Sequence, residues 1–186
     1  MTPAITLEEL LVWNLECSDF WKSHLEANPA LLELPCDIGG TANVQELVAH
    51  IWGVELRWSQ RIAGLPATDK KEMPAGPLDA IFGLHVQARD IFRELLHDPA
   101  VQWDEPIALD LPWLKPPTRQ FSRRKLAGHA LFHSQRHWAQ LATLVRVAGY
   151  PSGFKGDLLF SSGLEYIEDS WISGGRRCIA SGGEGR

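Results

Sequence analysis

Apolar residues recur at intervals of three and four in four separate stretches of the chain, which is the spacing of one buried face of an α-helix. Each stretch is bounded by residues typical of helix ends: Thr6, Asn43 and Ser122 can act as N-caps, and prolines or glycines follow the last apolar position. The pattern predicts helices over residues 6–27, between Asn43 and Gly64, over residues 78–97 and over residues 123–148.

The connecting segments predict how these helices are joined. Residues 29–42 hold two prolines and a Gly-Gly pair, which indicates a loop with at most a short helical turn in 30–34. Residues 65–77 hold three prolines and form a connection longer than an antiparallel turn needs, so they permit a crossover. Apolar alternation within 107–111 favours a short strand or an extended loop.

Length and composition then bound the architecture. A chain of 186 residues and 20.8 kDa with 45% hydrophobic residues is sufficient for one domain with a sizeable core. Together with the helical pattern this predicts an all-α four-helix bundle over residues 1–160. Residues 161–186 end in a glycine-rich tail with little to bury, so we expect a C-terminal extension that is partly mobile.

Charge and cysteine content indicate partners and compartment. A net charge of −5 and a pI near 5.8 argue against nucleic-acid binding, which needs a basic stripe. No window approaches eighteen unbroken apolar residues, and the amino terminus lacks the features of a signal peptide. Three scattered cysteines favour a reducing compartment. We therefore expect a cytoplasmic protein without nucleic-acid or membrane partners.

Three histidines at intervals of four stand out in the last predicted helix. His129, His133 and His137 form one column on its face, because residues four apart on a helix lie above one another. A His-x-x-x-His pair supplies two ligands for a zinc-like ion. A straight column rises about 6 Å per step, so the third ligand must come from elsewhere. His50, beside the apolar stripe of the second helix, is the best third ligand.

Less specific explanations stay open for each of these residues. A histidine on an apolar face is more often a core residue, and His-x-x-x-His pairs also occur on solvated faces. His129 could replace His137 as a ligand, but we favour a lining role. His85 is a core candidate and a spare ligand. Glu46 could orient the His50 ring, although a solvated carboxylate is the commoner role for such a residue.

Three parts of the sequence, taken with the histidines, resemble the DinB-like (damage-inducible) family. They are residues 47–55 with His50, residues 129–141, and the helix exit at 148–151 followed by 157–160. Around the last histidine the family pattern usually reads His-His-Arg-Gly-Gln, whereas this chain has Arg136-His137-Trp138-Ala139-Gln140.

The resemblance implies a bundle in up-down-down-up order, with the crossover between its second and third helices. It also implies a divalent transition metal, commonly nickel or zinc with iron or manganese also compatible, held by His50, His133 and His137. Members with assigned reactions include transferases and isomerases that use small thiols such as bacillithiol, mycothiol or glutathione.

These observations lead to two functional hypotheses. The first is a metal-dependent hydrolase or small-thiol-dependent transferase that acts on a small molecule through an open ligand position. The alternative is a non-catalytic metal-binding or dimerisation bundle. Eight tryptophans and a wide apolar face on the last helix favour a homodimer. A ferritin-like di-iron protein is excluded, because it needs two Glu-x-x-His pairs and this chain has only one, at Glu94 and His97.

Overall fold

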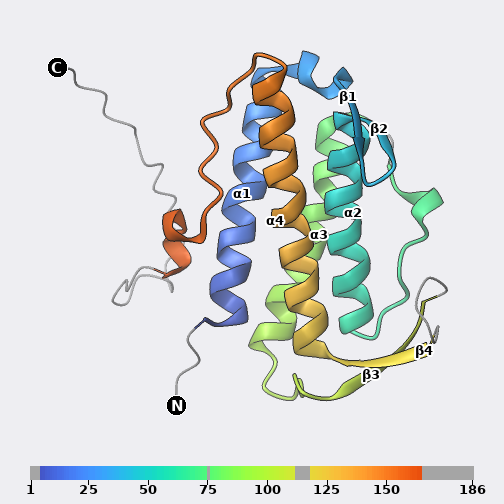
Figure 1. Ribbon diagram of the computed structural model, residues 1–186. Helices are drawn as coiled ribbons and strands as arrows, with labels where there is room; N and C mark the ends of the chain where they lie inside the picture. Colours follow the sequence, from blue (N-terminus) through green and yellow to red (C-terminus); the bar gives the residue numbers. More distant parts are fainter. Residues whose placement is uncertain (1–4, 75, 112–117, 165–186) are drawn as a thin grey trace.

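Four helices pack together, and two small hairpins lie at opposite ends of the bundle in the computed structural model (Figure 1). The structure describes residues 5–74, 76–111 and 118–164. The helices are α1 (Leu7–Ala27), α2 (Val44–Ile62), α3 (Leu78–His97) and α4 (Arg123–Val147). In the hairpins, β1 (Pro35–Ile38) pairs with β2 (Thr41–Asn43), and β3 (Pro106–Asp110) pairs with β4 (Thr118–Ser122). The described residues also form four short 3-10 helices: η1 (Pro29–Glu33), η2 (Lys70–Glu72), η3 (Leu158–Phe160) and η4 (Ser162–Leu164).

The helices begin where the sequence predicts caps. Thr6 and Glu9 form a reciprocal capping box at α1, with the Glu9 N–H 3.2 Å from the Thr6 hydroxyl. The Asn43 side chain accepts from the backbone of α2 at 2.9 Å, and Ser122 accepts from that of α4 at 3.3 Å. Local side-chain chemistry therefore sets the starts of α1, α2 and α4.

The chain reverses direction after α1, keeps its direction after the crossover and reverses again before α4. In Figure 1, α1 and α4 run upwards while α2 and α3 run downwards. The crossover between α2 and α3 is fastened to α2, because the Gln60 amide exchanges hydrogen bonds of 2.8 and 2.9 Å with Thr68. Met73 also packs against Gly53, where any Cβ would lie 2.4 Å from its sulfur. The crossover thus lies along the outer side of α2.

The two antiparallel hairpins are the main departure from the predicted all-α fold. The segment 29–42 contains the expected short helical turn as η1 but continues into β1 and β2. The alternation at 107–111 does form a strand, and its partner β4 directly precedes α4. The β1–β2 hairpin lies beside the start of α2 (Figure 1), close to the histidine of that helix.

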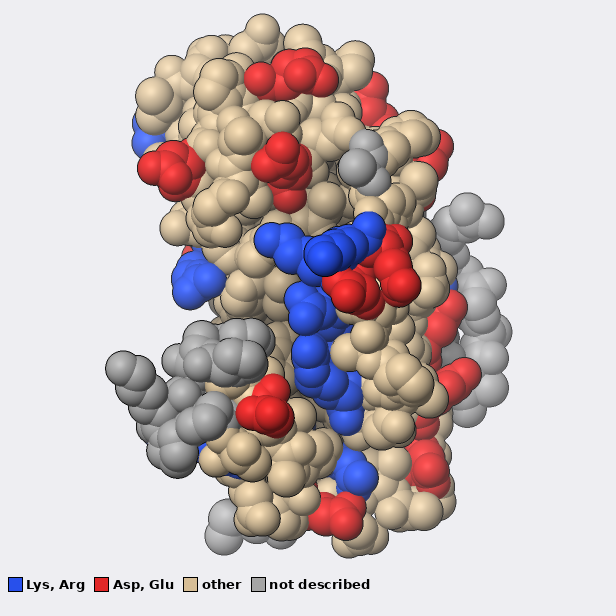
Figure 2. Space-filling view, turned by 90° about the vertical axis from the view of Figure 1, so that its right-hand side faces the viewer, with Lys and Arg blue, Asp and Glu red and all other residues tan. Residues whose placement is uncertain are grey.

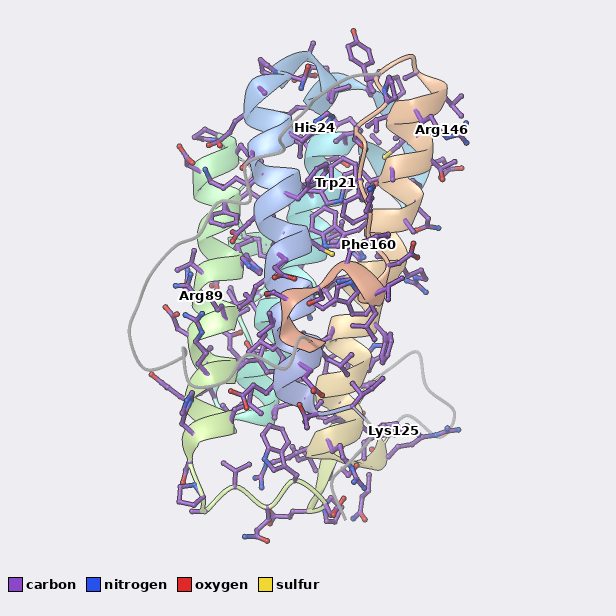
Figure 3. All side chains as sticks on the ribbon, turned by 90° about the vertical axis from the view of Figure 1, so that its left-hand side faces the viewer. Trp21, His24, Arg89, Lys125, Arg146 and Phe160 are labelled. Carbon is purple, nitrogen blue, oxygen red and sulfur yellow. The ribbon has the colours of Figure 1, made fainter. Side chains whose placement is uncertain are left out.

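Three fully buried indoles form the centre of the core. Trp21 of α1 stacks on Trp138 of α4 with ring centroids 6.0 Å apart, and Trp52 of α2 meets Trp138 edge-on at 5.8 Å. Figure 3 shows Trp21 directed inward from α1 toward α4. These side chains pack between the helices. No helix in the described ranges is long and apolar enough to cross a membrane.

The chain after α4 returns along α1. The Trp13 indole N–H donates to the Gly156 carbonyl at 3.0 Å, and the Ser162 hydroxyl donates to the Glu16 carboxylate. The start of the predicted extension, at Ser161 and Ser162, therefore packs on the bundle. The remainder of that extension, 165–186, lies outside the described residues, and its predicted mobility stays a prediction.

Candidate metal centre

His50 of α2 and His133 and His137 of α4 come together between the two helices and form what we call the histidine triad. Each residue offers one ring nitrogen, and the three nitrogens lie within 4.8 Å of one another. The ring centroids are 5.2 Å apart for His50 and His133, 5.1 Å for His50 and His137, and 4.5 Å for His133 and His137. The adjacent packing of α2 and α4 thus brings together residues that are 83 and 87 positions apart in the chain.

The surroundings keep these imidazoles neutral. Burial lowers the pKa of His50 to about 4, and the positive charges of His137, Lys70 and Arg136 contribute to the shift. Burial likewise lowers the pKa of His133 to about 3, with the other two triad members adding to it. The pKa of His137 is also lowered, first by burial and then by Arg136. Neutral rings with free lone pairs are the form that binds a metal ion.

The Gln140 side chain fixes the orientation of His137. Its amide oxygen lies 2.7 Å from Nδ1 of His137 and accepts that N–H, which leaves the lone pair on Nε2. The Arg136 guanidinium donates to this Nε2 at 3.0 Å. Arg136 is exposed, so its side chain can turn into solvent when Nε2 binds another group. A ligand histidine held through its second nitrogen is the usual arrangement in metal sites.

The donor set fits a divalent transition ion. Two ligands of a tetrahedral zinc ion lie about 3.4 Å apart at the usual bond length, so small side-chain adjustments bring three nitrogens within 4.8 Å onto one ion. The Nδ1 atom of His133 is buried and has no hydrogen-bond partner among the described residues. Buried polar atoms are normally partnered, so this nitrogen fits the role of a ligand or of a group that awaits one.

The turn of the β1–β2 hairpin covers the triad at Gly39. Gly39 has a positive φ of 65°, and a Cβ there would lie 3.6 Å from both His50 Nε2 and His137 Cε1. The absence of a side chain therefore leaves space directly beside two of the three rings. The Gly39-Gly40 pair was part of the loop predicted over residues 29–42, but its position over the histidines depends on tertiary packing.

The other candidate residues lie outside the triad. His129 is exposed one turn earlier in α4, with its ring 6.1 Å from that of His133, and it lines one cavity together with His133. Glu46 is exposed, and its carboxylate accepts the Ala42 N–H at 2.9 Å at the start of α2, which matches the alternative of a helix-face carboxylate.

His85 is a core residue, 2.8 Å from Glu55. Burial raises the pKa of Cys17 to about 11, so its thiol is protonated at neutral pH.

Two cavities adjoin the triad. The larger, of about 480 Å³, is lined by His50, Lys70 and Arg57, and the smaller, of about 240 Å³, is lined by His133, Arg57 and Arg61. Arg57, Arg61 and Lys70 were not selected as site residues from the sequence. The spacing of the two arginines did indicate their position, since they follow His50 by seven and eleven residues and so share its face of α2.

The bundle, its crossover and the histidine cluster between α2 and α4 define a class, namely helical bundles with a candidate three-histidine metal site. The chain belongs to the DinB superfamily, whose family model matches residues 20–141 and so includes all three histidines. The family predicted from the sequence is therefore confirmed. A search of curated proteins found no match to the chain.

Proposed function

We propose that this protein is a metal-dependent enzyme, a hydrolase or a small-thiol-dependent transferase, that acts on a small molecule. The observation that carries the proposal is the convergence of three ring nitrogens from α2 and α4 beside a cavity of about 480 Å³. Three protein ligands leave a further coordination position, which is the arrangement of catalytic rather than structural sites. A cavity of this volume is in the range that accommodates small ligands.

His50, His133 and His137 are the residues that would hold the ion. When bound, a divalent ion at such a site supplies Lewis acidity that makes a water or thiol anionic near neutral pH. The triad contributes neutral nitrogens, because burial and neighbouring positive charge lower the pKa of each ring. Gln140 holds the Nδ1 proton of His137 and thereby leaves the lone pair on Nε2. Imidazole ligands suit nickel, zinc and iron, and the family resemblance adds manganese as a further candidate.

Metal content tests the site. The protein purified without a polyhistidine tag should contain close to one transition-metal ion per chain by elemental analysis. His133→Ala and His137→Ala should each lose most of it, because two ligands hold such an ion weakly. His97→Ala is the matched control, since His97 is exposed at the end of α3. Metal content that is unchanged in both triad variants would refute the assignment.

The Gln140 interaction gives a second test. Gln140→Leu keeps a similar volume but removes the acceptor for the His137 N–H. Loss of such a partner lowers metal affinity by about 10- to 100-fold. Competition with a chelator measures this affinity, and Gln140→Glu, which restores an acceptor, should recover most of it. A purely structural role for Gln140 would change stability but not affinity.

Turnover separates the enzyme from the non-catalytic bundle. The metal-loaded protein should consume either an ester or a small thiol such as glutathione or bacillithiol in a metal-dependent reaction. Consumption of thiol with formation of a conjugate identifies a transferase, and release of an acid without thiol identifies a hydrolase. Metal binding without turnover across both panels would favour the non-catalytic metal-binding or dimerisation bundle.

A further inference from the structure

Two arginines on α2 have no carboxylate partner in the part of the chain that the structure describes. Arg57 and Arg61, which we call the basic pair, are half-buried and one helical turn apart. The buried Nε of Arg57 has no hydrogen-bond partner among the described residues. Within the described ranges, Arg61 donates only to the Arg57 carbonyl, at 3.3 Å. By contrast, Arg89, Arg123 and Arg124 each pair with a carboxylate, from Asp90, Glu105 and Asp104 respectively.

This arrangement is unfavourable unless something binds it. Like charges four residues apart on a helix repel one another, and a partly buried guanidinium without an acceptor loses hydration that no protein group replaces. Burial, followed by the charge of Arg57, lowers the pKa of Arg61. The chain carries a net charge of −5 and therefore has an excess of carboxylates, yet none is paired with these two arginines among the described residues. A buried donor that the fold leaves unpaired calls for an external acceptor.

The basic pair lies where a bound molecule would reach the histidine triad. Arg57 lines both cavities, so it stands between the one that contains His50 and the one that contains His133. The Arg61 guanidinium lies 5.3 Å from the centre of the Trp58 ring, a contact that orients it in the smaller cavity. Lys70 adds a third positive charge to the larger cavity. Figure 2 shows Lys and Arg side chains gathered in a line on this face of the molecule.

We infer that Arg57 and Arg61, assisted by Lys70, bind the carboxylate or phosphate group of the small-molecule substrate, and that the reacting part of that substrate lies at the histidine triad. Guanidinium groups bind carboxylate and phosphate groups through two parallel N–H···O hydrogen bonds, and the unpaired Nε of Arg57 can donate one of them. The inference rests on the proposed function and specifies its substrate class as a small organic anion.

The test measures binding of inorganic phosphate and of succinate by calorimetry at fixed ionic strength. The double variant Arg57→Gln/Arg61→Gln should raise the Kd of the better ligand at least tenfold. Arg89→Gln is the control, because it removes one positive charge from α3 outside both cavities and should leave the Kd within twofold. The ligand that binds more tightly identifies the anionic group as phosphate or carboxylate.

A conservative variant guards against a failure to fold. Arg57→Lys/Arg61→Lys keeps the charge but loses the forked donors, so it should weaken binding less than the glutamine variant and more than the control. The inference is overturned if the Kd is the same in the wild type and in these variants. It is also overturned if Arg89→Gln weakens binding as much, since the effect would then be one of overall charge.

One further variant separates this inference from the proposed function. His137→Ala should lose the metal but bind the anion within threefold of the wild type, because His137 does not line either cavity. If the wild type itself holds no metal and still binds the anion through the arginines, the basic pair is upheld and the metal-dependent enzyme is refuted. If turnover depends on metal but anion binding does not change in the arginine variants, the metal-dependent enzyme is upheld and the role of the basic pair is refuted.

Discussion

At the scale of single residues, the backbone at Gly39 determines what can lie beside the histidine triad. Its φ of 65° is a conformation that residues with a side chain adopt at a cost of about 1 kcal/mol. A methyl group there would occupy the space next to His50 Nε2 and His137 Cε1. Gly40 has a similar φ of 76°, but nothing lies within 4 Å of its would-be Cβ.

This difference makes a matched pair of variants. Gly39→Ala and Gly40→Ala should both destabilise the protein by about 1 kcal/mol, because both place alanine at a positive φ. Only Gly39→Ala should also lower metal affinity, by about tenfold, since its methyl group would fill the space beside two of the ligand rings. Urea unfolding measures the first effect and chelator competition the second. Equal metal affinities in the two variants would show that the turn does not shape the site.

The lowered pKa values of the triad predict how stability depends on pH when metal is absent. His50 and His133 stay neutral in the folded chain down to about pH 4 and about pH 3, whereas both titrate near pH 6.5 when unfolded. The unfolded chain therefore takes up more protons below pH 6.5. The stability is complete above that pH and decreases as the pH falls, until the folded rings also titrate.

Unfolding in urea between pH 7.5 and 5, with a chelator present, measures this dependence. Each histidine contributes a slope of at most about 1.4 kcal/mol per pH unit. His133→Gln should have a shallower slope than the wild type, because it removes one of the two groups with a strongly lowered pKa. A wild-type protein whose stability does not change between pH 6.5 and 5 would contradict the prediction.

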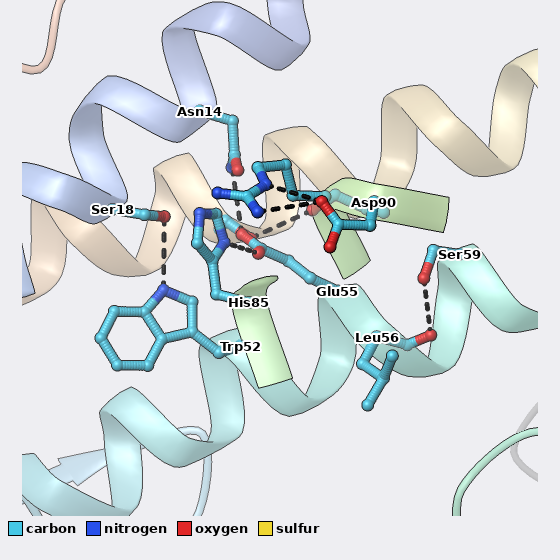
Figure 4. Close-up of polar contacts among 11 residues, drawn as sticks. Asn14, Ser18, Trp52, Glu55, Leu56, Ser59, His85 and Asp90 are labelled. Carbon is cyan, nitrogen blue, oxygen red and sulfur yellow. Dashed lines mark hydrogen bonds and ion pairs between the residues drawn. The ribbon is translucent and has the colours of Figure 1, made fainter. Parts of the chain in front are cut away.

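At the scale of elements, a buried polar network centred on α2 joins this helix to α1 and α3 (Figure 4). Glu55 of α2 accepts from the Asn14 amide of α1 at 3.1 Å, and its other oxygen lies 2.8 Å from Nδ1 of His85 in α3. All three side chains are 1 to 2% exposed. The network fixes α2 against α1 and α3, and α2 carries both His50 and the basic pair.

Removing the shared member should therefore be costly. Glu55→Ala leaves two buried polar groups unpaired, and we expect it to lower the free energy of unfolding by about 3 kcal/mol, as measured in urea. Glu94→Ala, on the exposed side of α3, should change it by less than about 0.5 kcal/mol. A similar effect in both variants would mean that the network does not hold the bundle together.

The sequence predicts the helices well and the hairpins poorly, for a physical reason. A helix is specified by local spacing and by caps such as Thr6, Asn43 and Ser122, so each helix end lies within about two residues of its predicted position. Strands β1 and β2 have four and three residues, too few to show alternation, and β4 has no apolar periodicity of its own. Their formation depends on a partner strand.

The candidate site shows the same limit. The spacing of His133 and His137 could be read directly, and His50 was accessible through its place on the apolar stripe. The Gly39 turn over the triad and the unpaired state of the basic pair depend on which helices and loops become neighbours, and no local pattern encodes that.

At the scale of the whole molecule, exposed apolar side chains on α4 and η3 suggest where two copies of the chain could meet. Phe132 of α4 is 56% exposed, and Leu159 and Phe160 of η3 are 85% and 55% exposed. Figure 3 shows Phe160 on the segment that crosses α1 and α4. Phe132 and Asp157, which precedes η3, line one shared hollow, so these side chains belong to one face. Apolar side chains gathered on one face are typical of protein interfaces.

Light scattering tests this homodimer proposal. The purified protein should have twice the mass of its 20.8 kDa chain, and Phe132→Glu/Leu159→Glu should reduce the mass to that of one chain. Leu65→Glu, at an exposed apolar residue just after α2, should leave the dimer intact. A monomeric wild type at micromolar concentration would refute the proposal.

The indole cluster in the core has a practical consequence. Trp138 directly follows His137 in the chain, and it contacts the rings of Trp21 and Trp52. An open-shell ion such as nickel quenches nearby tryptophan fluorescence, whereas zinc, with its filled d shell, does not. The emission of these buried indoles is therefore a built-in reporter that distinguishes the two cations in real time without any attached dye.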